Sequence, residues 1–135
     1  MKALLELGLP VDIMATALDE VVFIENYPGV LPVLKKNLAD LKSKKNYEIV
    51  EKDIYKSNFK FNLSEKFDLI FLDPPYKDKN LQNLITKIYN KKILKKNGVI
   101  IIHRHKKEKD EFPEFISIVE EKNYGISKII FLSYV

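Results

Sequence analysis

The sequence predicts a single α/β domain that spans residues 1–135 and is built on a mostly parallel, twisted β-sheet. Short apolar runs alternate with amphipathic stretches, which is the pattern of strands and helices that alternate along such a sheet. Polar residues follow four of these runs: Glu25, Asp53, Asp73 and His103. Because ligands bind outside the carboxyl ends of parallel strands, we expect these side chains to line one cleft.

Four strands are expected where β-branched and aromatic residues form short runs. The runs cover residues 21–24, 47–50, 67–72 and 98–103. The last of them contains four consecutive β-branched residues and has the composition of the most deeply buried strand. Residues 124–135 are expected to close the chain as a strand or a hairpin.

Helices are expected between these strands, where apolar residues recur at helical spacing. Residues 30–41 follow a break at Pro28-Gly29 and carry four such leucines: Leu31, Leu34, Leu38 and Leu41. Residues 81–89 carry four apolar residues on one face: Leu81, Leu84, Ile85 and Ile88. Residues 114–122 are expected to form a third helix.

The composition is that of a globular protein, with 46% apolar and 31% charged residues. No apolar run approaches the roughly 18–20 residues that a membrane span needs, and the N-terminus lacks the pattern of a signal peptide. The absence of cysteine excludes disulfides and thiolate metal sites and fits a reducing compartment, so we expect a cytoplasmic location. The net charge of +4 is a mild indication of a polyanionic partner.

Asp73-Pro74-Pro75-Tyr76 comes directly after the apolar run 67–72. The two prolines fix φ, donate no hydrogen bond and hold the preceding residues extended, so carbonyl groups are left as outward acceptors. An amine on an aromatic base is a poor nucleophile because its lone pair is delocalised into the ring. The Asp73 carboxylate and the Pro74 carbonyl can hold both N–H groups, and Tyr76 can stack on a flipped base. The motif therefore indicates chemistry on an exocyclic amine.

Glu25 ends the 21–24 run and can accept hydrogen bonds from ribose hydroxyl groups, as acidic residues do in dinucleotide folds. Asn26, beside it, is assigned to the same cofactor site. Asp53 can accept a hydrogen bond from an adenine amine, and Ile54 can pack on the adenine ring. These residues predict a nucleotide-like cofactor, although a solvated strand end can also carry such carboxylates.

A basic cluster follows the fourth strand: His103, Arg104, His105, Lys106 and Lys107. We expect it either to contact RNA phosphates or to be a solvated run of charge. The two histidines share a face of the strand, but no third ligand accompanies them, so no metal site is expected.

With these motifs in place, the chain resembles the RsmD family of bacterial 16S rRNA guanine-N2 methyltransferases. The resemblance runs from Val21 to the C-terminus. It rests on residues 21–26, 33–38, 67–76, 98–105 and 124–128, in that order.

The resemblance implies a Rossmann-like class I methyltransferase fold with helices on both faces of the sheet and an antiparallel C-terminal strand. It implies S-adenosylmethionine as the methyl donor and a guanine N2 amine of 16S rRNA, free or in a small-subunit ribonucleoprotein, as the acceptor. Glu25 would bind ribose, Asp53 the adenine, and Asp73 to Tyr76 the target base. We expect a monomer.

The first 20 residues depart from the family pattern, in which a first strand leads into a glycine-rich turn. The nearest candidate turn surrounds Gly8 and holds one glycine, followed by Leu9 and Pro10. Residues 1–20 are therefore expected to be an atypical remnant of the cofactor loop, with the first strand and the turn incomplete. A chain that lacks its natural N-terminal part is favoured over a degenerate loop; residues 3–7 or 11–14 are the candidates for the first strand.

Two other functions stay open. Adenine-N6 methyltransferases of DNA or RNA use a similar motif, but they often carry a separate target-recognition segment. Enzymes that methylate protein glutamine typically begin the motif with Asn, so Asp73 favours a base. The second alternative is a catalytically impaired remnant that binds RNA without transferring methyl groups, which the atypical glycine turn suggests.

Overall fold

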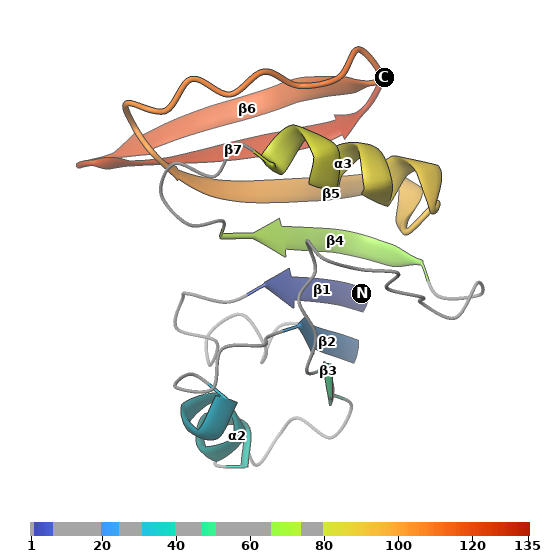
Figure 1. Cartoon of the computed structure of the whole chain (residues 1–135), viewed down its shortest axis with the longest axis vertical. Coiled ribbons are helices and arrows are strands. Elements are labelled where there is room, and N and C mark those ends of the chain that lie inside the picture. Colours follow the sequence, from blue (N-terminus) through green and yellow to red (C-terminus); the bar gives the residue numbers. More distant parts are fainter. Residues whose placement is uncertain (1, 7–19, 25–30, 40–46, 51–65, 74–79) are drawn as a thin grey trace.

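The computed structural model describes residues 2–6, 20–24, 31–39, 47–50, 66–73 and 80–135 (Figure 1). Seven strands and two helices lie in these ranges. In chain order they are β1 (Lys2–Glu6), β2 (Glu20–Ile24), α2 (Leu31–Ala39), β3 (Tyr47–Val50), β4 (Phe67–Leu72), α3 (Leu81–Asn90), β5 (Leu94–His105), β6 (Ile116–Tyr124) and β7 (Ser127–Tyr134).

The strands form one sheet in the order β3-β2-β1-β4-β5-β7-β6. β1 to β5 run parallel to one another, whereas β7 is antiparallel to both β5 and β6. The predicted Rossmann-like class I methyltransferase fold with an antiparallel C-terminal strand is thereby confirmed. None of the helices in the described ranges is long and apolar enough to span a membrane.

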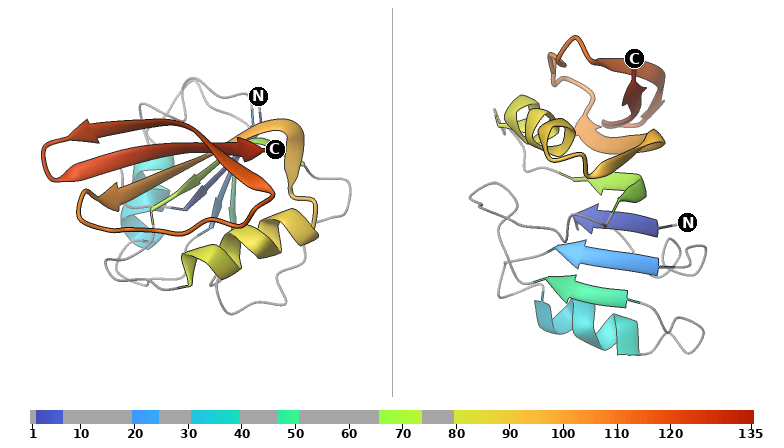
Figure 2. Two further views of the ribbon diagram at one scale, coloured as in Figure 1. Left: turned by 90° about the horizontal axis from the view of Figure 1, so that it is seen from above. Right: turned by 90° about the vertical axis from the view of Figure 1, so that its right-hand side faces the viewer.

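β1 lies inside the sheet, between β2 and β4 (Figures 1 and 2). Ala3 pairs with Val21 on one side and with Leu69 on the other. Of the two candidates for the first strand, residues 3–7 and 11–14, the first forms it, as β1. The turn expected around Gly8 lies outside the described residues. The sheet is continuous as a result, with no unpaired edge in the middle.

β6 corrects a second expectation, because residues 114–122 were expected to be helical. Their Glu and Lys residues favour a helix locally, but Ile116 and Ile118 pair with Tyr134 and Leu132 of β7. Pairing with a neighbouring strand and burial of Ile116 outweigh local helix propensity here. β6 is an edge strand of the sheet, and apart from Ile116 its side chains are exposed.

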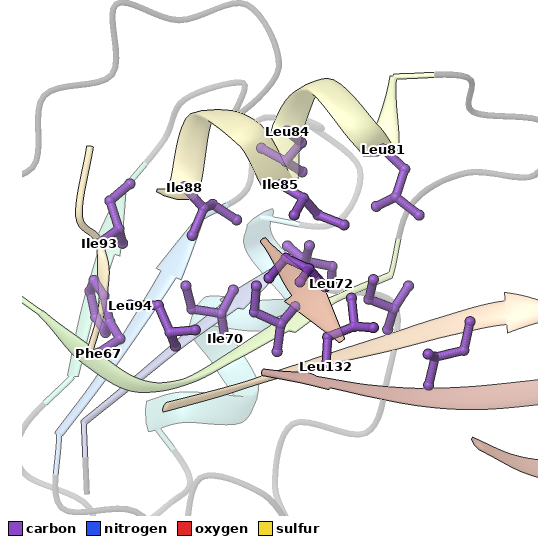
Figure 3. Packing of buried hydrophobic residues seen from close by; sticks show 14 residues of the cluster. Phe67, Ile70, Leu72, Leu81, Leu84, Ile85, Ile88, Ile93, Leu94 and Leu132 are labelled. Atoms are coloured by element: carbon purple, nitrogen blue, oxygen red, sulfur yellow. The ribbon is translucent and has the colours of Figure 1, made fainter. Parts of the chain in front are cut away.

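α3 packs its apolar side against one face of β4, β5 and β7 (Figures 1 and 3). The predicted apolar face is confirmed, since its four residues are buried: Leu81, Leu84, Ile85 and Ile88. Facing them in the core are Ile70, Leu72, Ile100, Ile102, Ile130 and Leu132. Truncation of one such buried side chain typically lowers the free energy of unfolding by about 2–5 kcal/mol. Because residues of both β4 and β5 pack in this core, it holds the ends of the two strands in place relative to each other.

Gly98 allows β4 and β5 to approach closely where their register is irregular, between Phe67 and Leu69. A Cβ atom at position 98 would lie 2.5 Å from Leu94 Cδ1 and 3.0 Å from the carbonyl oxygen of Asp68. Beyond this point the pairing is regular and runs to Leu72 opposite Ile102. Gly98 therefore helps to set which residues face each other at the carboxyl ends of the two strands.

Candidate active site

Asp73 lies directly after β4, beside the carboxyl end of β5. Phe71 pairs with Ile101 and Leu72 with Ile102, so the continued register brings Asp73 next to His103. The side chains meet: Oδ1 of Asp73 lies 2.9 Å from Nδ1 of His103. Asp73 is 19% exposed and His103 is 27% exposed, so both groups are partly covered and still reachable from solvent.

The pair lies on the face of the sheet away from α3. Ile100 and Ile102 are fully buried in the core beneath the helix, whereas His103 alternates with them and is only partly buried. Successive residues of a strand point to opposite faces, which places His103, and Asp73 bonded to it, on the other side.

The hydrogen bond has one direction when Asp73 is a carboxylate. A carboxylate only accepts, so the Nδ1–H of His103 donates to Oδ1. The imidazole then fixes the orientation of the carboxylate and leaves its second oxygen for another donor. An amine held at that oxygen would be oriented by a rigid strand end.

The order of the strands reverses between β1 and β4, since β1, β2 and β3 follow one another outward on one side and β4 and β5 on the other. In open α/β sheets the ligand crevice lies outside the carboxyl ends of the strands at such a switch point. Asp73 stands at the β4 side of this crevice. A nucleotide-like cofactor bound there would lie next to the carboxylate, so the strand arrangement fits S-adenosylmethionine.

The residues assigned to the cofactor lie outside the described ranges: Gly8, Glu25, Asn26, Asp53 and Ile54. The same holds for Pro74, Pro75 and Tyr76. The structure does give the ends of the strands that precede them. β2 ends at Ile24 and β3 at Val50, and both run parallel to β1, so these ends point to the same edge as the end of β4.

Arg104 differs from its neighbours in the basic cluster because its side chain is only 2% exposed. Nε and Nη2 donate to the two carboxylate oxygens of Asp110 across 2.9 and 2.8 Å, and Glu108 lies 3.7 Å away. The guanidinium therefore attaches residues 108–110 to the sheet. The cluster was expected either to contact RNA phosphates or to be a solvated run of charge, and the burial of Arg104 sets this residue apart from both expectations.

His105, Lys106 and Lys107 lie at the end of β5 and in the turn that follows. The backbone N–H of Lys107 donates to Nδ1 of His105 across 3.1 Å, and the backbone N–H of Lys106 donates to the carbonyl oxygen of Ile126 across 2.8 Å. Both lysines are exposed. Their contact with phosphate stays a prediction.

In the sequence His103 is part of the basic cluster, and nothing there connects it with Asp73. The signal available was that each residue follows an apolar run, which places both at strand ends, but the sequence alone does not give the register between the strands. Within the ranges that the structure describes, no group of three or more His, Asp or Glu side chains is placed to hold a metal ion.

A family model described as "Conserved hypothetical protein 95" matches residues 8–133. Among curated proteins, the chain is similar to the Ribosomal RNA small subunit methyltransferase D of Buchnera aphidicola subsp. Acyrthosiphon pisum. The two are 32% identical over 76% of this chain and 52% of the relative. The protein of the same name from Haemophilus influenzae is 30% identical over 79% of this chain and 56% of its own length. The chain thus spans about half the length of these two relatives.

Two solved structures show the same fold. A conserved hypothetical protein of Streptococcus pyogenes superposes with a TM-score of 0.76 at 19% identity, over 98% of this chain and 86% of that one. The ribosomal protein L11 methylase of Lactobacillus delbrueckii subsp. bulgaricus superposes with a TM-score of 0.66 at 15% identity. That match covers 98% of this chain and 69% of the methylase.

Proposed function

Because the chain belongs to the family described as Conserved hypothetical protein 95, the RsmD family, we propose that it transfers a methyl group from S-adenosylmethionine to the N2 amine of a guanine in 16S rRNA. The observation that carries this proposal is the Asp73 carboxylate. It stands at the carboxyl end of β4, beside the strand-order switch point, and is held there by His103. The names of the two rRNA methyltransferase relatives support RNA as the substrate.

Asp73 would bind the target amine through its second carboxylate oxygen, with the Pro74 carbonyl as the other acceptor. Holding both N–H groups out of the plane of the base makes the nitrogen lone pair available for attack. When bound, S-adenosylmethionine supplies the electrophilic methyl group. As the bond from the amine nitrogen to the methyl group forms, the bond from that methyl group to the donor sulfur would break, and S-adenosylhomocysteine would leave as a neutral thioether. The positive charge passes to the amine nitrogen, and its proton leaves to Asp73 or to water. The negative charge of Asp73 stabilises that positive charge as it develops.

The cofactor would be held at the carboxyl ends of β1, β2 and β3. We assign the ribose hydroxyl groups to Glu25, with Asn26 beside it, and the adenine to Asp53 and Ile54. We assign Gly8 to the cofactor as well, as the glycine of a turn between the first strand and the next. Tyr76 would stack on the target base, with Pro75 fixing its position.

The RNA would approach the same edge of the sheet, where Lys106 and Lys107 are exposed at the end of β5. A net charge of +4 favours a polyanion. The substrate is 16S rRNA or a small-subunit ribonucleoprotein, and the protein acts as a cytoplasmic monomer.

The proposal is tested with methyl-labelled cofactor and small-subunit particles that lack the modification. Nucleoside analysis of the rRNA should give N2-methylguanosine. N6-methyladenosine would instead identify an adenine-N6 enzyme. If the folded protein gives no heat on calorimetric titration with millimolar S-adenosylmethionine and transfers no label, the chain is an RNA-binding remnant, and the proposal is wrong.

A further inference from the structure

The face that carries Asp73 and His103 continues across the hairpin of β6 and β7. His103 is paired with Ile129 of β7, and Ile129 is paired with Lys122 of β6. Residues directly opposite each other in neighbouring strands share a face. Lys122 therefore lies on the same side of the sheet as the Asp73–His103 pair and at the same level along the strands.

A second row lies two residues further toward the carboxyl end of β5. His105 is paired with Ser127, and Ser127 with Tyr124. Side-chain contacts agree with this division of the faces. The Nζ of Lys122 lies 5.9 Å from the ring centre of Phe131, which is on the same face of β7 as Ile129. On the opposite face, Oε1 of Glu121 lies 3.8 Å from Nζ of Lys128.

Tyr124 is 60% exposed at the tip of the hairpin. Gly125 follows it with φ of 57°, which an L side chain rarely adopts and which a two-residue hairpin turn requires at its first position. The turn is attached to the end of β5 by the hydrogen bond from Lys106 N–H to the carbonyl oxygen of Ile126. An exposed aromatic ring is thus held at the catalytic edge of the sheet, with Lys106 and Lys107 beside the turn.

From these rows we infer that Lys122 and Tyr124 form a second RNA contact, which binds the nucleotides next to the target base. The proposal rests on the proposed function for the identity of the nucleic acid. Three strand spacings and two residues separate Asp73 from Tyr124, which is on the order of 15 Å, a span of a few nucleotides. Tyr124 offers a ring on which a flanking base stacks, and Lys122 offers an ammonium group for a phosphate.

Glu120 limits this contact, because its carboxylate lies 3.7 Å from Nζ of Lys122. Both groups are about half exposed, so the pair is weakly held and the ammonium group can turn to a phosphate. Removal of the carboxylate by Glu120→Gln should tighten RNA binding, which is a change in the direction opposite to damage of the fold.

Equilibrium binding of a fluorescently labelled single-stranded fragment of 16S rRNA, measured by anisotropy without cofactor, tests the inference. Tyr124→Ala should raise the dissociation constant at least fivefold, in line with the loss of one stacked base. Tyr124→Phe keeps the ring and should bind as the wild type does. Lys122→Ala should weaken binding and lower the slope of log K against log salt by about 0.7.

Lys96 provides the matched control, because it is an exposed lysine near the amino end of β5, whereas the proposed contact lies beside the carboxyl end of that strand. Lys96→Ala should leave the dissociation constant unchanged. Circular dichroism of each variant should match that of the wild type.

The binding assay and the methyl-transfer assay fail independently. Weaker binding by Tyr124→Ala and Lys122→Ala, with Lys96→Ala unchanged, supports the second contact even if no methyl group is transferred. Unchanged binding in both variants overturns it, as does an equal loss in all three. A change in oligomeric state on Tyr124→Ala without a change in RNA binding also overturns it, and identifies the tip as a contact between chains.

Discussion

The Nδ1–H of His103 donates to Oδ1 of Asp73 across 2.9 Å, so a side chain at the end of β5 orients the carboxylate at the end of β4. The strands that carry them are locked by the α3 core on the opposite face of the sheet. The sheet thus fixes the position of the Asp73 backbone, and the imidazole of His103 fixes the orientation of the carboxylate. If Asp73 binds the target amine, His103 is a positioning residue for the reaction.

Substitution of His103 by leucine should slow methyl transfer about tenfold or more, because a hydrogen bond to a charged group contributes about 1.5–3 kcal/mol. The dissociation constant for S-adenosylmethionine should not change. Asparagine can place its Nδ2 near the position of Nδ1, so His103→Asn should recover most of the rate. Single-turnover kinetics of the two variants measures this. A His103→Asn protein as slow as His103→Leu would show that imidazole chemistry, rather than orientation of Asp73, is what matters.

Arg104 should matter for stability. Its guanidinium is buried and bonded through two nitrogens to Asp110, so Arg104→Ala leaves that carboxylate without its counter-charge. Breaking a buried pair in this way typically costs about 3–5 kcal/mol of unfolding free energy. The exposed neighbour Lys107 is the control, and Lys107→Ala should change the unfolding free energy by less than about 0.5 kcal/mol. Urea denaturation compares the two, and equal effects would mean that Arg104 is not an anchor.

Tyr134 should make the fold less stable at high pH. Burial, followed by the nearby Tyr89, raises the pKa of the Tyr134 hydroxyl to about 12, from the ordinary value of 10.0. The folded protein therefore favours the neutral phenol. This contribution to stability is complete below about pH 10 and is lost as the pH rises through 12.

Tyr134→Phe tests this directly, because phenylalanine keeps the ring that meets Tyr89 edge-on at 5.3 Å and removes the ionisable hydroxyl. That hydroxyl is buried and has no hydrogen-bond partner among the residues that the structure describes, so its loss should not destabilise the fold at neutral pH. The midpoint of urea unfolding is measured at pH 8 and at a pH above 11. It should fall less between these two pH values for Tyr134→Phe than for the wild type. Parallel loss in both proteins would contradict the assignment.

Much of the sheet follows from local sequence. The runs at 21–24, 47–50 and 67–72 became β2, β3 and β4 with bounds within one residue of those expected, because β-branched and aromatic residues there leave little choice. β6 was missed because Glu120, Glu121 and Lys122 favour a helix, and only its partner β7 makes it a strand. β5 begins at Leu94, earlier than expected, because Lys95, Lys96 and Asn97 are polar residues held in an exposed part of the strand.

The candidate site was predictable in part. Asp73 stands out because it joins an apolar strand to two prolines, which is visible in the sequence. Its contact with His103 was not predictable, because it depends on the register of β4 against β5. That register passes an irregularity between Phe67 and Leu69, which no local pattern reveals. The burial of Arg104 depends in the same way on Asp110, which reaches back from the segment after the strand.

Asp73 is proposed to act on the target amine and not on the cofactor. The most direct measurement is the single-turnover rate of methyl transfer by Asp73→Ala, together with its dissociation constant for S-adenosylmethionine. We predict that transfer is abolished while cofactor affinity stays close to that of the wild type. A large loss of cofactor affinity, or a rate near that of the wild type, would contradict the role assigned to Asp73.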